Sequence, residues 1–192
     1  MTDIANRRVT TPAGKPARRS AVTGADAPKR REPPAKAARK GVHGVALYTF
    51  REKWRDAPLK DRVQIERDGV PAGVVKVLID KIGVSSVDFI SYVGIPKATF
   101  SKKMRERSAF AGTPGQSVVG FVELINKVED ILAAQRDNPE ATNFDVEKWV
   151  GEWVERPQPA LGGMTPAELM DTPSGRASVM RVLGAMQSGA YQ

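Results

Sequence analysis

From about residue 46 onward, apolar residues recur at the three- and four-residue spacing that places them along one side of an α-helix. The strict alternation of apolar and polar residues that marks a β-strand is scarce. The pattern therefore predicts an all-α protein, with helices over the segments 46–55, 59–67, 72–82, 86–93, 96–106, 114–136, 143–155, 166–170 and 174–187.

Several of these helices begin at residue pairs that are typical of a capping box. In this motif a hydroxyl accepts a backbone N–H three residues on, and an acidic or amide side chain there bonds back to the first residue. The pairs with this spacing are Thr113 with Gln116, Thr165 with Glu168, Ser85 with Asp88 and, more weakly, Thr142 with Asp145. Pro114 and Pro166 stand at the first helical position, where the missing N–H of proline costs nothing.

The longest predicted helix carries an apolar seam with alternating spacings of three and four residues. Its members are Val118, Phe121, Ile125, Val128 and Leu132. A seam of about two heptads is compatible with a coiled-coil dimer. It also suits a core between two parts of one chain, which is the interpretation that we favour.

The segment 86–106 has the pattern of a helix-turn-helix, in which a short helix, a turn at Gly94 and a basic second helix follow one another. The apolar residues expected to hold the motif to the core are Val87, Ile90 and Val93 in the first helix, Ile95 in the turn and Phe100 in the second helix. The alternative is a plain helical hairpin with a solvated basic face.

The second helix of such a motif meets base edges with its N-terminal part, while flanking residues hold phosphates. We expect bases to be faced by Lys97, Ala98 and Ser101, and the DNA backbone to be bound by Thr99, Lys102, Lys103, Arg105 and Arg107. No Asn or Gln stands early in this helix to read adenine, so specificity would rest on lysine contacts and DNA shape. Because the motif usually reads two half-sites, we expect a homodimer.

Charge changes this picture, because the net charge of +8 is spread unevenly over the 192 residues. Residues 1–40 hold eleven Lys/Arg against three Asp/Glu, whereas residues 108–192 hold six against eleven. The basic N-terminal part favours binding to a polyanion, and the acidic C-terminal part favours binding to a different partner. Residues 1–41 are rich in Pro, Ala, Arg and Lys, so we expect a disordered tail there. That tail is either a DNA-binding arm or a solvated linker.

Other classes of protein are disfavoured by what the sequence lacks. It contains no cysteine and no apolar run of membrane-spanning length, and its basic start has no apolar signal-peptide segment. We expect a cytoplasmic protein that does not enter the membrane. The lone histidine, His43, has no catalytic partner motif, and we find no phosphate-binding loop or metal-ligand cluster. The sequence therefore predicts a protein that is not an enzyme and needs no cofactor or metal.

The C-terminal segment carries the most specific motif of the chain. Trp149 and Trp153 precede the stretch 157–176, which reads PQPALGGMTPAELMDTPSGR, and the chain closes with an apolar stripe and Gly189-Ala190-Tyr191. This segment, about residues 142–192, closely resembles the toxin-binding domain of Xre/ParS-type antitoxins, also called MbcA-like. The segments 67–72, 82–85 and 93–100 resemble the Xre-type DNA-binding half more weakly. Pro96 departs from that half, because many relatives have a capping Ser there.

The resemblance implies a bacterial antitoxin that binds a RES-domain, NAD-degrading toxin, masks its active site and represses its own promoter on double-stranded DNA. It implies an Xre-like helix-turn-helix domain over 42–112 and a helical toxin-binding domain over 113–192, and it does not cover the tail over 1–41. The residues that we expect to contact the toxin are Trp153, Leu161, Gly162, Gly163, Thr165, Pro166, Gly189, Tyr191 and Gln192. We expect Tyr191 to enter or cover the NAD pocket of the toxin.

The core residues of the C-terminal helices and an alternative function complete the interpretation. We expect Trp149, Val182 and Leu183 to belong mainly to the core, since an apolar stripe on a helix is more often core than interface. The alternative function is a stand-alone helix-turn-helix regulator or nucleoid-associated protein, in which the basic tail dominates and the acidic half contacts only itself.

Overall fold

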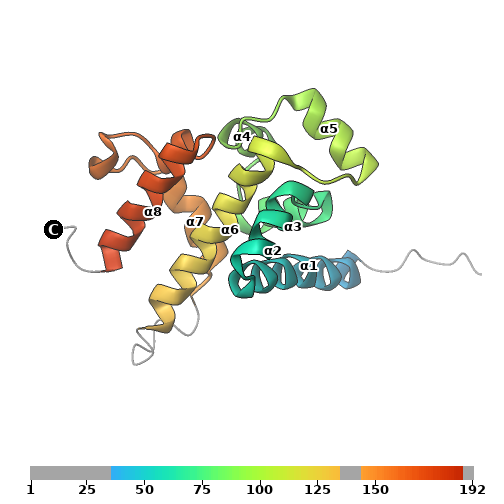
Figure 1. The fold of residues 1–192 in the computed structure, drawn as a ribbon, viewed down its shortest axis with the longest axis horizontal. Helices are drawn as coiled ribbons and strands as arrows, with labels where there is room; N and C mark the ends of the chain where they lie inside the picture. Colours follow the sequence, from blue (N-terminus) through green and yellow to red (C-terminus); the bar gives the residue numbers. More distant parts are fainter. Residues whose placement is uncertain (1–35, 135–143, 188–192) are drawn as a thin grey trace, which may run out of the picture. The chain divides into compact units, whose positions relative to one another are not determined.

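The computed structural model describes residues 36–134 and 144–187, and among these it contains helices and no strand (Figure 1). The helices are α1 (Lys36–Asp56), α2 (Leu59–Asp68), α3 (Ala72–Ile82), α4 (Ser86–Tyr92), α5 (Lys97–Glu106), α6 (Gly112–Ala133), α7 (Val146–Val154) and α8 (Pro173–Gln187), with 3₁₀ turns η2 (Pro159–Leu161) and η3 (Pro166–Leu169). The prediction of an all-α protein is confirmed.

The first helix begins earlier than its apolar pattern predicted. α1 starts at Lys36, so the last residues of the expected tail, 36–41, belong to a helix. The sequence there, Lys-Ala-Ala-Arg-Lys, consists of strong helix formers, and it extends the helix beyond its apolar part. The remainder of the predicted tail lies outside the described residues.

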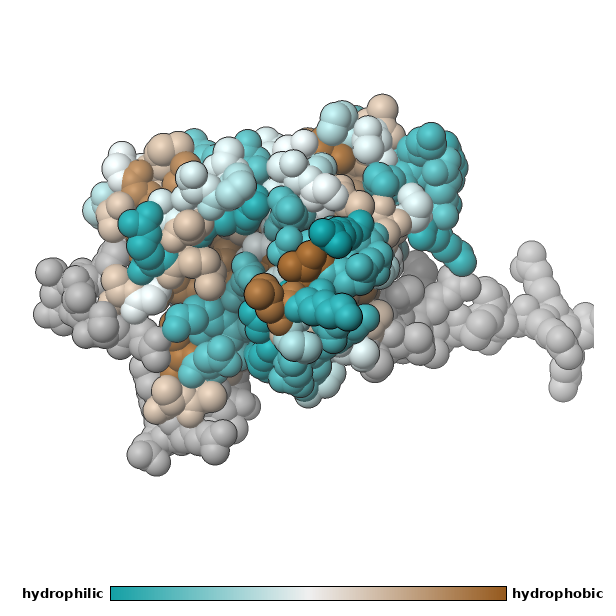
Figure 2. All heavy atoms as spheres, in the orientation of Figure 1, coloured by the Kyte–Doolittle hydropathy of each residue, from teal (hydrophilic) through white to brown (hydrophobic). Residues whose placement is uncertain are grey.

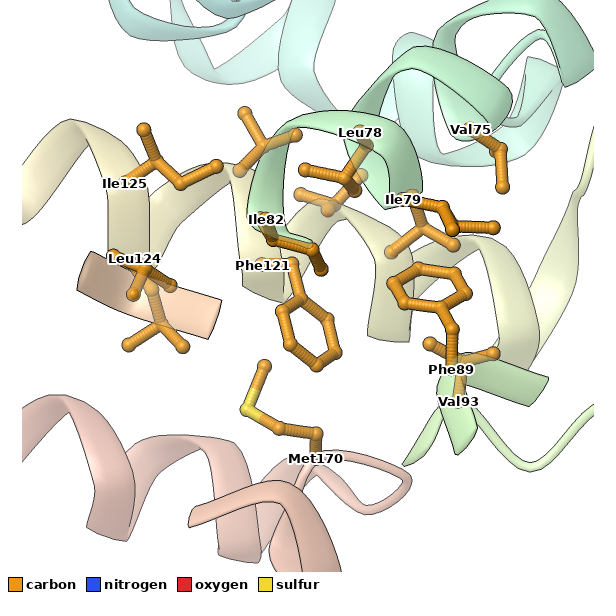
Figure 3. Close-up of a cluster of buried hydrophobic side chains, with 14 of the residues drawn as sticks. Val75, Leu78, Ile79, Ile82, Phe89, Val93, Phe121, Leu124, Ile125 and Met170 are labelled. Carbon is orange, nitrogen blue, oxygen red and sulfur yellow. The ribbon is translucent and has the colours of Figure 1, made fainter. Parts of the chain in front are cut away.

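The core forms around α3 and α6. Phe121 and Ile125 of α6 are fully buried, and the ring of Phe121 lies 5.3 Å from that of Phe89 in α4. Figure 3 shows both rings together with Met170, which follows η3. The apolar seam of α6 therefore belongs mainly to the core of one chain, as favoured, because its members are buried except Leu132, which is partly buried.

One close approach joins the C-terminal helices to this core. α7 crosses the C-terminal end of α3 at Gly151, where an added Cβ would lie 1.8 Å from the carbonyl oxygen of Ile82. Only glycine lets the two helix backbones come this near. Val150 and Val154, on either side of Gly151 in α7, are fully buried as a result.

The predicted helix starts are confirmed at two places and wrong at another. Ser85 and Thr165 accept the backbone N–H groups of Asp88 and Glu168. α6, however, begins at Gly112 without a side-chain cap, so Thr113 lies inside its first turn. α7 is capped by Asp145, whose carboxylate accepts the N–H of Lys148 at 3.0 Å, and Thr142 lies outside the described residues.

A cluster of ionised side chains fastens α1 to the C-terminal half. Arg51 is only 4% exposed and donates to Asn126 Oδ1 at 3.0 Å and to Glu147 Oε1 at 2.9 Å. Arg51 also pairs with Glu129, to which Arg55 donates at 2.6 Å. Because removal of one partner would leave a buried charge uncompensated, this cluster fixes the position of α1 against α6 and α7.

Candidate functional site

The two helices of the predicted DNA-binding motif lie where the sequence places them. α4 ends at a turn in which Gly94 has a φ of +64°, Ile95 is buried, and α5 then runs from Lys97 to Glu106. Phe100 anchors α5 as expected, with its ring 5.6 Å from that of Phe110.

The inward face of α4 differs from the expected one. Val87 was expected in the core, but it is 66% exposed, and Phe89 is fully buried instead. α4 has only seven residues, and its orientation is set by the packing of Phe89 against Phe121. A helix this short has too few apolar positions for periodicity alone to define its buried side.

Most of the residues expected to contact DNA are free to do so. The exposed ones on or next to α5 are Lys97, Ala98, Thr99, Ser101, Lys102, Arg105 and Arg107. Lys103 differs, because its Nζ donates to the carbonyl oxygen of Ala109 at 2.6 Å and lies 5.8 Å from the centre of the Phe110 ring. Lys103 therefore holds the end of α5 to the following chain and is not a free phosphate contact.

The second candidate surface is the loop that joins α7 to α8. Gly162 and Gly163 have φ values of +69° and +83°, and space is open around both. The loop closes on itself, because the N–H of Gly163 and the carbonyl of Met164 both bond to the backbone of Gln158. Met164 projects from it and is 43% exposed. The backbone of this loop is thus presented to solvent in a fixed shape.

The loop ends at a complete capping box. Thr165 Oγ1 accepts the N–H of Glu168, whose carboxylate in turn accepts the N–H of Thr165 at 2.7 Å. This backbone hydrogen bond, together with the Thr165 hydroxyl, holds the pKa of Glu168 below its ordinary value. Pro166 is buried, so it supports the loop from within and does not offer its ring to a partner.

The burial of the two tryptophans of α7 differs in part from that expected, since Trp149, expected mainly in the core, is only partly buried against it. Trp153, the expected interface residue, is only 4% exposed, and its ring stacks on that of Trp149 at 5.8 Å. Val146, Val150 and Trp153 form the three- and four-residue stripe that faces the core, which leaves Trp149 at its edge. Trp149 is half-buried and touches Phe144, which is 39% exposed.

The last helix agrees with its predicted apolar stripe except at Met186, which was expected on that stripe and is 38% exposed. Val182 and Leu183 of α8 are buried, as is Val179. The expected toxin contacts Gly189, Tyr191 and Gln192 follow this helix and lie outside the described residues.

The two candidate surfaces are connected by contacts that the sequence analysis did not anticipate. The hydroxyl of Tyr92 in α4 donates to Glu155 at the end of α7 at 2.9 Å. Burial and this carboxylate raise the pKa of the Tyr92 phenol. At the turn after α4, Gly94 lies against the side chain of Asp171. These pairs are more than sixty residues apart in sequence, so no local pattern could have revealed them.

Within the described ranges, no three His, Cys, Asp or Glu side chains come together as a metal site would require. None of the helices between residues 36 and 134 or 144 and 187 is long and apolar enough to cross a membrane.

Comparisons with known proteins cover the C-terminal segment and, in two relatives, most of the chain. Residues 143–189 match the family model of the antitoxin Xre/MbcA/ParS C-terminal toxin-binding domain. A protein of Sphingobium sp. (strain YBL2), named Prs ADP-ribosylating antitoxin, is 30% identical over 148 residues, which are 77% of this chain and 91% of the relative. A protein of Photorhabdus laumondii, named Antitoxin Xre, is 23% identical over 125 residues, which are 65% of this chain and 77% of the relative.

Proposed function

Because the chain belongs to the Xre/MbcA/ParS-type antitoxins, we propose that it neutralises a RES-type, NAD-degrading toxin by masking its active site, and that it represses its own operon. The observation that carries the proposal is the match of residues 143–189 to the toxin-binding domain of this family. The proposed setting is the bacterial cytoplasm, with the antitoxin partly bound to DNA as a homodimer.

The surface proposed to meet the toxin consists of the glycine loop and the end of the chain. Leu161, Gly162 and Gly163 offer backbone and a half-buried apolar side chain in a shape fixed by the hydrogen bonds of Gln158. Tyr191 is proposed to enter or cover the NAD pocket of the toxin, and Gly189 and Gln192 are proposed as further toxin contacts. The buried positions of Trp153 and Pro166 give them a supporting role within the fold rather than a direct contact with the toxin.

The proposed DNA surface is the exposed side of α5. Lys97, Lys102 and Arg105 present cations there, and neutralisation of DNA phosphates by such cations releases counterions. In Figure 1, α5 and α8 lie at opposite ends of the view, which leaves room for DNA and toxin to bind at the same time.

We propose a binding role rather than an enzymatic one. The name of the Sphingobium relative mentions ADP-ribosylation. We assign that chemistry to the partner toxin, because the exposed side of α5 and the glycine loop are surfaces suited to binding macromolecules. The purified chain alone should therefore leave NAD intact, and release of nicotinamide by the purified chain would contradict this assignment.

The proposal is tested by co-expression with the RES-type toxin that we propose is encoded beside this gene. The full chain should restore growth and co-purify with the toxin in high salt. A chain lacking residues 189–192 should fail to restore growth while keeping its melting temperature and its affinity for the promoter fragment. Full rescue by the truncated chain would refute the role of Tyr191 and Gln192. The absence of any toxin in the purified complex would favour a stand-alone DNA-binding regulator.

A further inference from the structure

An open groove lies between α2, α6 and α8, outside both surfaces described above. The groove has a volume of about 460 Å³, and Val119 and Met180 form its apolar walls. Glu66, Glu123 and Arg176 also line it, so its ionised groups carry a net negative charge when both carboxyls are ionised. A groove of this volume has room for one or two large apolar side chains.

The same helix that borders the groove also carries an exposed apolar ridge. Leu59 is 79% exposed, the highest value among the large apolar side chains of the described residues, and Val63 is 36% exposed. The two are four residues apart and so share one side of α2, whereas Ile65 is buried on the opposite side. In Figure 2, apolar spheres stand among hydrophilic ones near the middle of the view, where Figure 1 draws α2 and α6.

We propose that this face is the dimer interface, in which α2 packs antiparallel to α2 of a second copy and Leu59 enters the groove of that copy. A two-fold symmetric interface must contain both a projection and its matching recess on one surface. α2 meets this requirement, because Leu59 lies at its start and Glu66, on the rim of the groove, lies near its end.

The charges of α2 support this pairing. With the two-fold axis at Val63, residues 60 and 66 are equally far from the axis, so Lys60 of each copy lies opposite Glu66 of the other. The exposed ammonium of Lys60 would then add a cation to a groove that holds two carboxylates and one guanidinium. The seam of α6 is not available for dimerisation, because it is already buried within one chain.

The inference rests on the proposed function only in expecting two copies on DNA. Its test is sedimentation equilibrium of the full chain, with charge reversals at exposed or half-buried positions. Lys60→Glu and Glu66→Lys should each weaken dimerisation at least about tenfold, because each places like charges opposite one another. Leu59→Gln should also weaken it. Lys76→Glu, which changes the net charge equally on the exposed side of α3, should have no effect.

Mixing provides the decisive measurement. A copy with Lys60→Glu and a copy with Glu66→Lys restore both opposite-charge pairs, so the mixture should form heterodimers as readily as the wild type forms homodimers. The double variant K60E/E66K should also dimerise normally. An effect on folding within one chain cannot produce rescue by mixing.

Each remaining outcome overturns the inference without touching toxin neutralisation. Wild-type affinity in both single variants, or no recovery on mixing, would place the dimer interface elsewhere. A wild-type chain that stays monomeric at all concentrations, with and without promoter DNA, would refute the dimer itself. Growth rescue by the same variants reports on the toxin surface independently.

Discussion

Replacement of Gly151 by alanine should separate α7 from α3. The added Cβ would lie 1.8 Å from the carbonyl oxygen of Ile82, whereas a carbon and such an oxygen normally stay about 3.3 Å apart. α7 would have to move by roughly 1.5 Å, and the obstacle is backbone, which cannot rotate away as a side chain would. Val150 and Val154, both fully buried, would lose contacts through this shift.

The expected loss of stability lies at the upper end of the range for overpacked cores, about 3 kcal/mol. For a chain of this size that corresponds to a fall in melting temperature of about 6 to 12 °C in scanning calorimetry. Gly184→Ala in α8 is the matched control, because its Cβ would meet nothing within 4 Å. Alanine there should stabilise the helix by up to about 1 kcal/mol. Equal melting temperatures for Gly151→Ala and the wild type would refute the close packing of α7 on α3.

Three further results are expected. Lys102→Ala should weaken promoter binding and reduce the slope of affinity against salt concentration by about one phosphate contact. Lys103→Ala should instead lower the melting temperature and leave this slope unchanged. Equal slopes for the two variants in anisotropy titrations would contradict the assignment. Burial by itself raises the pKa of Glu129, but Arg51 and Arg55 outweigh it and hold that pKa below the ordinary value. The contribution of Glu129 to stability is therefore present above pH about 4.3 and is lost as the pH falls through the lowered pKa. Burial raises the pKa of Glu123, only partly opposed by the indole of Trp54, so Glu123→Gln should stabilise the protein at neutral pH while Glu129→Gln destabilises it in urea titrations between pH 3 and 7. Thr165→Ala should cost about 1 kcal/mol by loss of the capping box and should weaken toxin binding in calorimetry, an effect that Thr165→Ser should largely avoid.

The sequence predicts the helices well where they are long and amphipathic. α3 was placed with its observed bounds, since its buried positions recur at helical spacing and glycine follows its end. Prediction failed at α4, because Phe89 is buried by Phe121, a residue 32 positions away, rather than by its own periodicity. The beginning of α1 was missed for a related reason: helix propensity without apolar residues leaves no periodic signal.

The candidate site was predictable in its motif and less so in its exposure. The glycine loop and the cap at Thr165 follow from local chemistry that adjacent residues specify. The deeper burial of Trp153 than of Trp149 does not, because both fit the same helical stripe and only the neighbouring helices decide which one is covered. The groove beside α2 is formed by three segments that are distant in sequence, so no single stretch of the chain predicts it.

The proposed DNA-binding and toxin-binding surfaces do not belong to two separately folded halves of the chain. α4, the first helix of the proposed DNA-binding pair, buries Phe89 against Phe121 of α6 and donates from Tyr92 to Glu155 of α7. The predicted boundary at residue 112 falls at the start of α6, a helix whose side chains fill the core beneath α4 (Figure 3). A chain cut there would expose Phe89 and Val93 and lose the surface that orients α5. We therefore expect one cooperative unfolding transition for residues 36–187, and a fragment ending at residue 112 that neither folds nor binds the promoter; a folded, DNA-binding fragment would show instead that the helix pair supports itself.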